Sequence, residues 1–395
     1  MDSSYVSNNC KKGTAVYLDN AATTKVDSQV LNIMRRYERI LYGNASSKYS
    51  LGELSKKAIE DSRVIIASAI NAEPSEIYFT SGGTEANNWV IKGLKNKYRF
   101  RPMHIISSEF EHHSVLDSIH YRANEIQDIE YTLVSPGKNG LIDVIDVSES
   151  FRLNTELCSV MMVNNELGTM QPIERIADKC KNNGIIFHTD AVQAFGQIPI
   201  DVKKNNISLM SFSSHKINGP KGIGALYISK EIKGRMNPLM HGGQQERKMR
   251  AGTENAPAIV GFGKATEIAI AGMAENEEKE KELQKFLLEQ LRYIDGVNVN
   301  GDSNFIDPRH INIRIAGCRA EQLISLFNEQ KIFVSSGSAC TSESNSPSHV
   351  LKAIGLSDTQ ANSSIRISIG RYNTLSDIDY FIDCLKLNIG IIRGM

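Results

Sequence analysis

A single lysine, Lys216, stands where a short apolar run gives way to a glycine-rich turn, in the stretch LMSFSSHKINGPKGIG at residues 209–224. In an open α/β sheet, side chains at the carboxyl ends of strands reach into the crevice that binds ligands. Most lysines are solvated surface charges, but a lysine held in such a crevice can lose its proton and form a Schiff base with a carbonyl. The position of Lys216 therefore predicts a nucleophilic amine.

A second apolar run ends in a carboxylate at Asp190, after the segment IIFHT. An Asp that follows a strand often does no more than cap the next helix. Two strand ends that offer an Asp and a Lys, however, match what pyridoxal phosphate requires. The lysine holds the aldehyde of that cofactor as an imine, and the acid keeps its ring nitrogen protonated. The pair predicts pyridoxal 5'-phosphate as the cofactor.

A glycine turn at residues 81–84, SGGT, lies between a predicted strand and a predicted helix. Backbone amides and the helix dipole bind phosphate at such a place, although glycines also mark many ordinary turns. Thr84 adds a hydroxyl donor, and Ser213 and His215 beside the lysine can add more. The turn is a candidate phosphate site.

Two further side chains can contact a planar cofactor. His112 opens a predicted helix in EHHSVLD, where it can stack on a ring and move protons near neutral pH, or cap the helix. Asn165 follows a predicted strand in VNNELG, and its amide can bond a ring hydroxyl or a substrate carboxylate.

Cys340 lies in SSGSACTS, among residues too small and polar to form a core. Most free cysteines are buried small hydrophobes, but this setting predicts an accessible thiol that can act as a nucleophile. The six cysteines include no Cys-x-x-Cys pair, which fits neither a disulfide framework nor a zinc site and indicates a reducing compartment. We assign no chemistry to the other five.

Composition limits the function classes. The chain has 395 residues, 41% of them hydrophobic, and equal numbers of basic and acidic residues, 45 each. The zero formal charge argues against general affinity for nucleic acid or anionic membrane, so we expect no direct nucleic-acid binding. No run approaches the roughly 18 apolar residues of a membrane span, and the polar first residues resemble neither a signal nor a transit peptide. We therefore expect a cytoplasmic protein.

Strand-length apolar segments alternate with helical patterns, which predicts an α/β fold with a largely parallel sheet covered on both faces. A long amphipathic helix at residues 264 to about 292 then leads to a smaller α/β region. The expected strands lie at residues 77–79, 105–106, 158–163, 185–187, 209–212, 225–228, 310–315 and 365–370, and other expected helices at 52–70, 173–182 and 321–330.

Taken together, the chain resembles the cysteine desulfurases of the NifS and IscS type, in the class V aminotransferase group of fold type I pyridoxal phosphate enzymes. The likeness spans nearly the whole chain. It implies a mostly parallel seven-stranded sheet in a large domain at residues 17–263. It also implies a smaller domain at 264–395 that carries the cysteine loop 335–348, and an amino-terminal segment 1–16 that packs on it. The motifs that carry it are FTSGGTE, EHHSVLD, VNNELG, HTDAVQ, SFSSHKINGPKGIG, HGGQQERKMRAGTEN and SSGSACTS.

The resemblance also implies a role for each matched residue. Lys216 would hold the cofactor, Asp190 would pair with its ring nitrogen and His112 would lie over the ring. Thr253 would reach the phosphate of a partner subunit, which implies a homodimer. Arg366 would clamp the substrate carboxylate through its planar fork. The remaining positions are the phosphate ligands Gly83, Thr84, Ser213, Ser214 and His215 and the ring-oxygen ligands Asn165 and Gln193.

The implied reaction converts L-cysteine to L-alanine and leaves the sulfur on Cys340 as a persulfide. From there it passes to acceptor proteins, such as an iron–sulfur scaffold, for cluster, thio-cofactor or thio-nucleoside synthesis. The resemblance implies no resident metal, although Cys340 can transiently ligate a cluster on such a scaffold. Ala45 and Tyr49 depart from the family pattern, which usually has Pro and His there, near the active-site entrance.

Three alternatives share the scaffold. A selenocysteine lyase would act on selenocysteine, and a class V aminotransferase would use Lys216 and Asp190 without needing Cys340. A non-catalytic adaptor would bind an acceptor protein without the reaction. Loss of Lys216, His112 or Cys340 would have favoured the adaptor, and all three are present.

Overall fold

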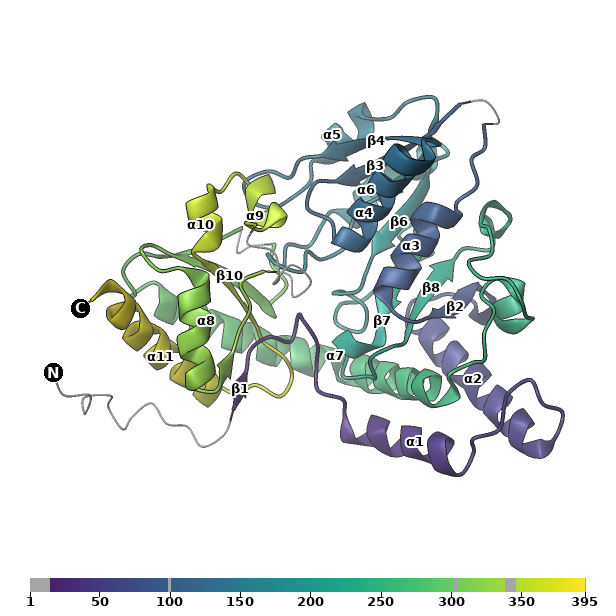
Figure 1. The fold of residues 1–395 in the computed structure, drawn as a ribbon, viewed down its shortest axis with the longest axis horizontal. Coiled ribbons are helices and arrows are strands. Elements are labelled where there is room, and N and C mark those ends of the chain that lie inside the picture. Colours follow the sequence, from purple (N-terminus) through teal and green to yellow (C-terminus); the bar gives the residue numbers. More distant parts are fainter. Residues whose placement is uncertain (1–14, 99–100, 302–304, 338–345, 395) are drawn as a thin grey trace.

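In the described residues of the computed structural model, which are 15–98, 101–301, 305–337 and 346–394, a seven-stranded sheet forms the centre of the larger part (Figure 1). Its order is β2-β8-β7-β6-β5-β3-β4, and β8 runs antiparallel to both neighbours while the strands from β7 to β4 are parallel. The predicted fold class is confirmed. The strands are β2 (Ile77–Thr80), β3 (Met103–Ser108), β4 (Ile129–Val134), β5 (Thr155–Ser159), β6 (Ile186–Asp190), β7 (Leu209–Ser213) and β8 (Gly224–Ile228).

Helices cover both faces of this sheet, which explains why its inner strands are buried along their whole length. One buried cluster joins the sheet to α2, α6 and the beginning of α7, and another joins the opposite face to α3 and α4. The helices of this part are α1 (Ser28–Arg39), α2 (Ser50–Ser68), α3 (Gly83–Gly93), α4 (His113–Tyr121), α5 (Val144–Glu149) and α6 (Ile173–Asn182), with the short turns η3 (Pro74–Glu76), η4 (Arg122–Ile126), η5 (Ser214–Lys216), η6 (Lys233–Arg235) and η7 (Gln245–Lys248).

The long helix α7 (Ala256–Leu291) runs beside both parts of the molecule (Figure 1). It begins eight residues before the predicted start at 264, because the Asn255 side chain caps it by accepting from the Ala258 amide. Glycines in its first turns allow close packing on α1 and α2. A Cβ at Gly261 would lie 2.8 Å from Met34 Cγ, and one at Gly263 would lie 2.8 Å from Ser62 Cβ.

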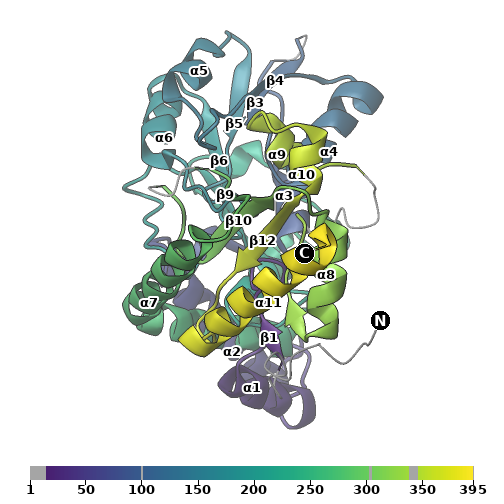
Figure 2. The ribbon, with the colours of Figure 1, turned by 90° about the vertical axis from the view of Figure 1, so that its left-hand side faces the viewer.

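The smaller part is built on an antiparallel sheet, with α8 and α11 in front of it in Figure 2. Val16 and Leu18 pack in its core, whereas Val350 and Leu351 of α9 pack in the core of the large sheet. The domain boundaries at 16/17 and 263/264 stay predictions. The elements are β9 (Val297–Val299), β10 (His310–Ile315), β12 (Ser364–Ser368), the parallel pair β1 (Val16–Tyr17) and β11 (Ile332–Phe333), and the helices α8 (Ala320–Glu329), α9 (His349–Ala353), α10 (Asp358–Asn362) and α11 (Leu375–Arg393).

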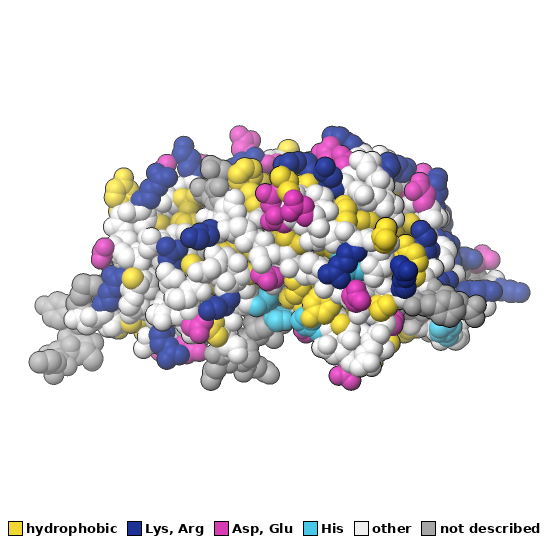
Figure 3. All heavy atoms as spheres, turned by 90° about the horizontal axis from the view of Figure 1, so that it is seen from above, with side chains coloured by type: hydrophobic (Ala, Val, Ile, Leu, Met, Phe, Trp, Pro, Cys, Tyr) yellow, Lys and Arg dark blue, Asp and Glu magenta, His cyan; other side chains and the backbone are white. Residues whose placement is uncertain are grey.

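Basic and acidic side chains are interspersed over the face seen in Figure 3, and a group of histidines lies near its middle. No helix within the described ranges is long and apolar enough to cross a membrane.

Candidate active site

Lys216 and Asp190 lie at the same edge of the large sheet. Asp190 is the last residue of β6, which pairs in parallel with β7, and Lys216 lies in the turn that follows β7 directly. The Lys216 Nζ donates hydrogen bonds to the backbone oxygens of Ala21 and Ala22, the second at 2.8 Å. The lysine is therefore held by the segment that connects β1 to α1.

A cavity of about 170 Å³ at this edge brings together residues from both parts of the chain. Ser214 and Thr253 do not line it, and Cys340 lies outside the described residues. The predicted site residues that line it are Gly83, Thr84, His112, Asn165, Asp190, Gln193, Ser213, His215, Lys216 and Arg366.

The Asp190 carboxylate is 5% exposed and is oriented by two donors. Its Oδ1 accepts from the Val192 amide at 2.9 Å and its Oδ2 from Asn87 Nδ2 at 2.7 Å. The same Asn87 nitrogen also donates to Ser114 Oγ at 2.9 Å. Because these bonds fix the carboxylate at the cavity wall, Asp190 can pair with a protonated ring nitrogen.

His112 is the N-cap of α4, so the capping role weighed from the sequence and a place in the cavity occur together. Its Nδ1 accepts from the Ser114 amide at 3.1 Å and lies 2.8 Å from Ser114 Oγ. Burial lowers the pKa of His112, and nearby Lys216 adds to this while Asp190 opposes it. The imidazole is therefore neutral, and because Nδ1 accepts, Nε2 carries the proton.

The beginning of α3 is the candidate phosphate site predicted from the sequence. Its N-cap, Gly82, has a φ of 157°, which favours glycine, and a Cβ at Gly83 would lie 2.5 Å from Val192 Cγ2. Thr84 and His215 line the cavity at this end. Burial lowers the pKa of His215 to about 3, so its neutral ring can donate a hydrogen bond without adding charge.

Arg366 reaches the cavity from β12 in the smaller part and is 1% exposed. Its Nη1 donates to the Asn165 backbone oxygen at 2.8 Å, and its Nη2 donates to Asp19 Oδ1 at 2.7 Å. Two buried atoms here, Arg366 Nε and Asn165 Oδ1, have no hydrogen-bond partner among the described residues. A donor and an acceptor are thus left for a ligand. The Gln193 side chain is oriented by a hydrogen bond that its Nε2 donates to the Ala21 backbone oxygen at 2.9 Å.

These residues fit pyridoxal phosphate. The amino-terminal end of α3 and the hydroxyls of Thr84 and Ser213 suit the phosphate. The Asp190 carboxylate suits a ring nitrogen, and the Lys216 amine suits the aldehyde. No cluster of three or more His, Cys, Asp or Glu residues able to hold a metal occurs in the part of the chain that the structure describes.

The two ends of the segment that contains Cys340 are held next to this cavity. On one side, a Cβ at Gly337 would lie 3.4 Å from Glu166 Oε2. On the other side, Ser348 Oγ donates to the same oxygen at 2.5 Å, and His349 Nε2 lies 2.9 Å from the Glu111 backbone oxygen. Glu166 and Glu111, which make these contacts, are adjacent in sequence to the cavity residues Asn165 and His112.

Several site residues were not predicted from the sequence. Asn87 and Ser114 link the Asp190 carboxylate to His112, and Glu111 bonds Ser108 Oγ and the Met161 amide. Burial raises the pKa of Glu111 to about 8. Asn87 follows Thr84 by three residues on the same helix, and this spacing could have predicted that both side chains lie on one face of the helix, toward the cavity.

Other predicted positions lie elsewhere. Thr253 lines a different cavity of about 170 Å³, together with Thr80, Ser81 and Arg250. Ala45 is partly buried and Tyr49 is 59% exposed, and neither lines the Lys216 cavity.

Comparison with known proteins identifies the family. The family model described as class V aminotransferase matches residues 16–381. This chain therefore belongs to the class V aminotransferase family, as the sequence motifs predicted.

Within that family the similar proteins include desulfurases. Cysteine desulfurase IscS of Methanosarcina thermophila is 45% identical over 381 residues, which are 96% of this chain and 93% of that protein. The solved structure of a NifS-like protein has a TM-score of 0.89 at 34% identity and covers 97% of this chain and 100% of its own. The structure described as SspA in complex with cysteine has a TM-score of 0.81 at 38% identity, covering 91% of this chain and 100% of that one. The predicted resemblance to cysteine desulfurases is confirmed.

Proposed function

We propose that this chain is a pyridoxal 5'-phosphate-dependent cysteine desulfurase. It converts L-cysteine to L-alanine, takes the sulfur onto Cys340 as a persulfide and passes it to acceptor proteins. One observation carries the proposal: Lys216, Asp190, His112 and Arg366 line a single cavity, although they come from four separate segments. Family membership and the desulfurase relatives support the same reaction.

Each residue has a task that follows from its position. Pyridoxal phosphate, when bound, supplies a ring that accepts the electrons left when the substrate Cα loses its proton. Arg366 binds the substrate carboxylate through its unpartnered Nε. Lys216 takes the proton from the substrate Cα and later returns a proton to the substrate. Asp190 keeps the ring nitrogen protonated. Neutral His112 covers the ring and offers the Nε2 proton to the substrate.

The Cys340 thiolate then attacks the substrate sulfur. A sulfur–sulfur bond forms, the carbon–sulfur bond breaks, its electron pair goes to the carbon, and a proton completes alanine. Cys340 is three residues beyond Gly337, a span of at most about 10 Å in an extended chain. Because Gly337 adjoins Glu166, which is next to Asn165 of the cavity, this reach supports the role of Cys340.

The test is turnover of L-cysteine with a reductant. Purified protein should release alanine and sulfide in equal amounts, and Cys340→Ala should stop both while the bound cofactor keeps its absorbance. Cys10→Ala is the matched control and should leave turnover unchanged. Alanine formation that continues undiminished in Cys340→Ala would refute the persulfide reaction. Borohydride reduction and peptide mass mapping should place the pyridoxyl group on Lys216.

We also propose a homodimer in which Thr253 meets the phosphate bound by the partner subunit. The placement of Thr253 outside the cavity of its own chain supports this. Light scattering should give twice the chain mass. Thr253→Ala should then weaken cofactor binding, although this residue does not line the cavity in its own chain.

The sulfur acceptor and the compartment are further parts of the proposal. The described cysteines Cys158, Cys180 and Cys318 are free and buried, which supports a reducing compartment such as the cytoplasm. Capture of partners on the persulfide-loaded protein, with Cys340→Ala as the control, should identify an acceptor such as an iron–sulfur scaffold.

A further inference from the structure

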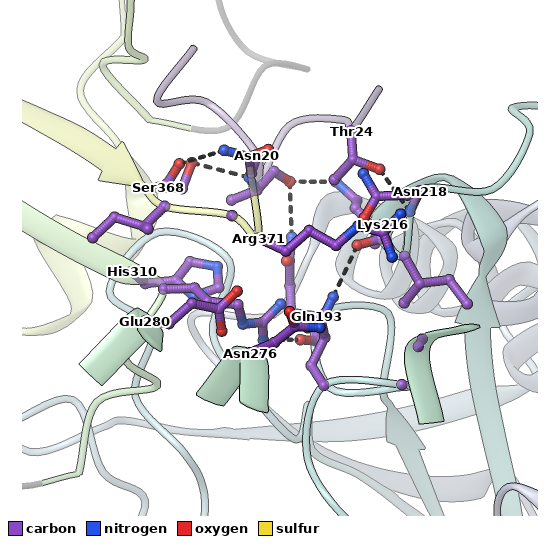
Figure 4. A pocket seen from close by; sticks show the side chains of 18 residues that line it. Asn20, Thr24, Gln193, Lys216, Asn218, Asn276, Glu280, His310, Ser368 and Arg371 are labelled. Atoms are coloured by element: carbon purple, nitrogen blue, oxygen red, sulfur yellow. Dashed lines mark hydrogen bonds between the residues drawn. The ribbon is translucent and has the colours of Figure 1, made fainter. Parts of the chain in front are cut away.

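A second, smaller cavity of about 30 Å³ also has Lys216 in its wall (Figure 4). It is lined by residues of α7, of β10 and of the turn after β12. A volume of this size has room for about two water molecules. Two of its lining residues, Asn276 and Arg371, are partly exposed, so water can exchange with solvent from this side.

Glu280 of α7 lies across this cavity from Lys216 (Figure 4). Its side chain is buried, at 4% exposure, and lines the cavity. Burial of a carboxyl disfavours its charged form, because water no longer solvates it. Burial also raises the pKa of Glu280 to about 8, so that it carries a proton at neutral pH.

The Arg309 cation interacts with Glu280, but its hydrogen bonds go to other groups. Arg309 lies in the same wall, but its Nε donates to Asp307 Oδ1 at 2.9 Å and its Nη2 donates to the Gln193 backbone oxygen at 2.7 Å. Arg309 also forms an ion pair with Asp307. Arg309 still favours the ionised form of Glu280, but burial outweighs this attraction and the pKa of Glu280 is raised.

A second buried titratable group, His310, lines the cavity, and its Nδ1 lies 3.8 Å from Asp307 Oδ1. His310 is 1% exposed, and neither ring nitrogen has a hydrogen-bond partner in the described part of the chain. Burial lowers the pKa of His310, so that its ring is neutral. The titratable and charged groups near Glu280 are Glu277 and Lys279 of α7, Asp307, Arg309 and His310 at β10, Arg371 after β12, and Lys216.

We propose that Glu280 is a proton relay for Lys216 and acts through water held in this second cavity. A proton leaves the Glu280 carboxyl for a water molecule while a proton from the water reaches the Lys216 Nζ. The products are a carboxylate and an ammonium group, and the reverse movement restores both partners. No other reactant is needed.

The relay gives Lys216 a contact with solvent protons on the side away from the cofactor cavity. This inference rests on the proposed function, in which Lys216 takes a proton from the substrate Cα. With the relay, that proton exchanges with solvent even while substrate fills the other cavity. Without the relay, it returns to the carbon from which it came.

The first test is infrared titration of cofactor-free protein. The spectrum of the wild type minus that of Glu280→Gln isolates the protonated Glu280 carboxyl, whose signal should disappear with a midpoint near pH 8. Lys216→Met, which removes the positive charge, should raise this midpoint by about one pH unit, the order expected for one charge across a small cavity at an effective dielectric constant of about 20. A midpoint that does not move would refute the coupling of the two groups.

The second test measures exchange of the Cα proton of L-alanine with solvent deuterium in the loaded protein. Glu280→Gln should slow this exchange by about tenfold or more, the low end of the effects of general acids and bases. Glu280→Asp should restore part of the rate. Glu278→Gln, at an exposed position on the same helix, is the matched control and should have no effect. Glu280→Leu removes the acid without leaving an amide and should behave like Glu280→Gln.

The outcomes separate the two proposals. If the protein binds pyridoxal phosphate on Lys216 and exchange is equally fast in Glu280→Gln and Glu280→Leu, the relay is wrong and the proposed function stands. If the cofactor does not bind on Lys216, the proposed function fails and the relay fails with it. A slowed exchange with partial rescue by Glu280→Asp supports the relay.

Discussion

Replacement of Arg366 by Lys should weaken binding of the substrate carboxylate while leaving the cofactor site intact. The guanidinium is fixed by Asn165 and Asp19, and its Nε is left for a ligand. A lysine keeps the charge that balances Asp19 but loses the planar fork. Loss of one hydrogen bond between charged groups costs about 1.5–3 kcal/mol, which corresponds to a KM for L-cysteine that is about 10–150-fold higher.

The assay is alanine formation as a function of L-cysteine concentration, with cofactor affinity measured separately by absorbance. Arg314→Lys is the control, because Arg314 lies on the neighbouring strand β10 and does not line the cavity. Arg366→Gln should add a loss of stability, since Asp19 then lacks its buried partner. A KM that changes less than about threefold in Arg366→Lys while kcat falls would refute the assignment of Arg366 to the carboxylate.

Further predictions concern the cofactor, the cysteine segment and pH. Thr84→Val should weaken pyridoxal phosphate binding about 10–150-fold, as loss of one hydrogen bond to a charged phosphate predicts. Ser214→Ala should have a smaller effect because Ser214 does not line the cavity, and titration of cofactor-free protein measures both. Glu166→Gln should slow persulfide formation but not change cofactor absorbance, because it weakens the bond from Ser348; trapping of the persulfide by alkylation measures this, and an unchanged rate would contradict it. Glu280 has a pKa of about 8 when folded and 4.5 as its ordinary value, so between these values only the folded state keeps the proton and stability falls as pH rises. Glu280→Gln should therefore show a smaller loss of unfolding free energy between about pH 5 and 8 in urea titrations, and an equal loss would contradict the raised pKa.

The sequence predicted the elements of the site well where the signal is local. The apolar run before Lys216, the glycine turn at Gly83 and the helix at residues 173–182 depend on neighbours a few positions away, and all three appear in the structure. The strand predicted at residues 158–163 was wrong in its bounds, since β5 covers Thr155–Ser159. The Glu111 side chain bonds the Met161 amide just beyond it, a contact that no local pattern reveals.

By itself, the sequence determined which residue types stand at strand ends and helix beginnings, because backbone geometry and apolar periodicity are set by near neighbours. Only the tertiary structure decided which of them meet. The strand order β7-β6-β5-β3 places Asp190 next to the lysine turn, and β12 carries Arg366 to Asn165 across 201 residues of sequence. The same packing buried Glu280 beside Arg309, which pairs with Asp307. Whether a charge is balanced depends on contacts between distant segments, and the spacing of residues along the chain does not encode those contacts.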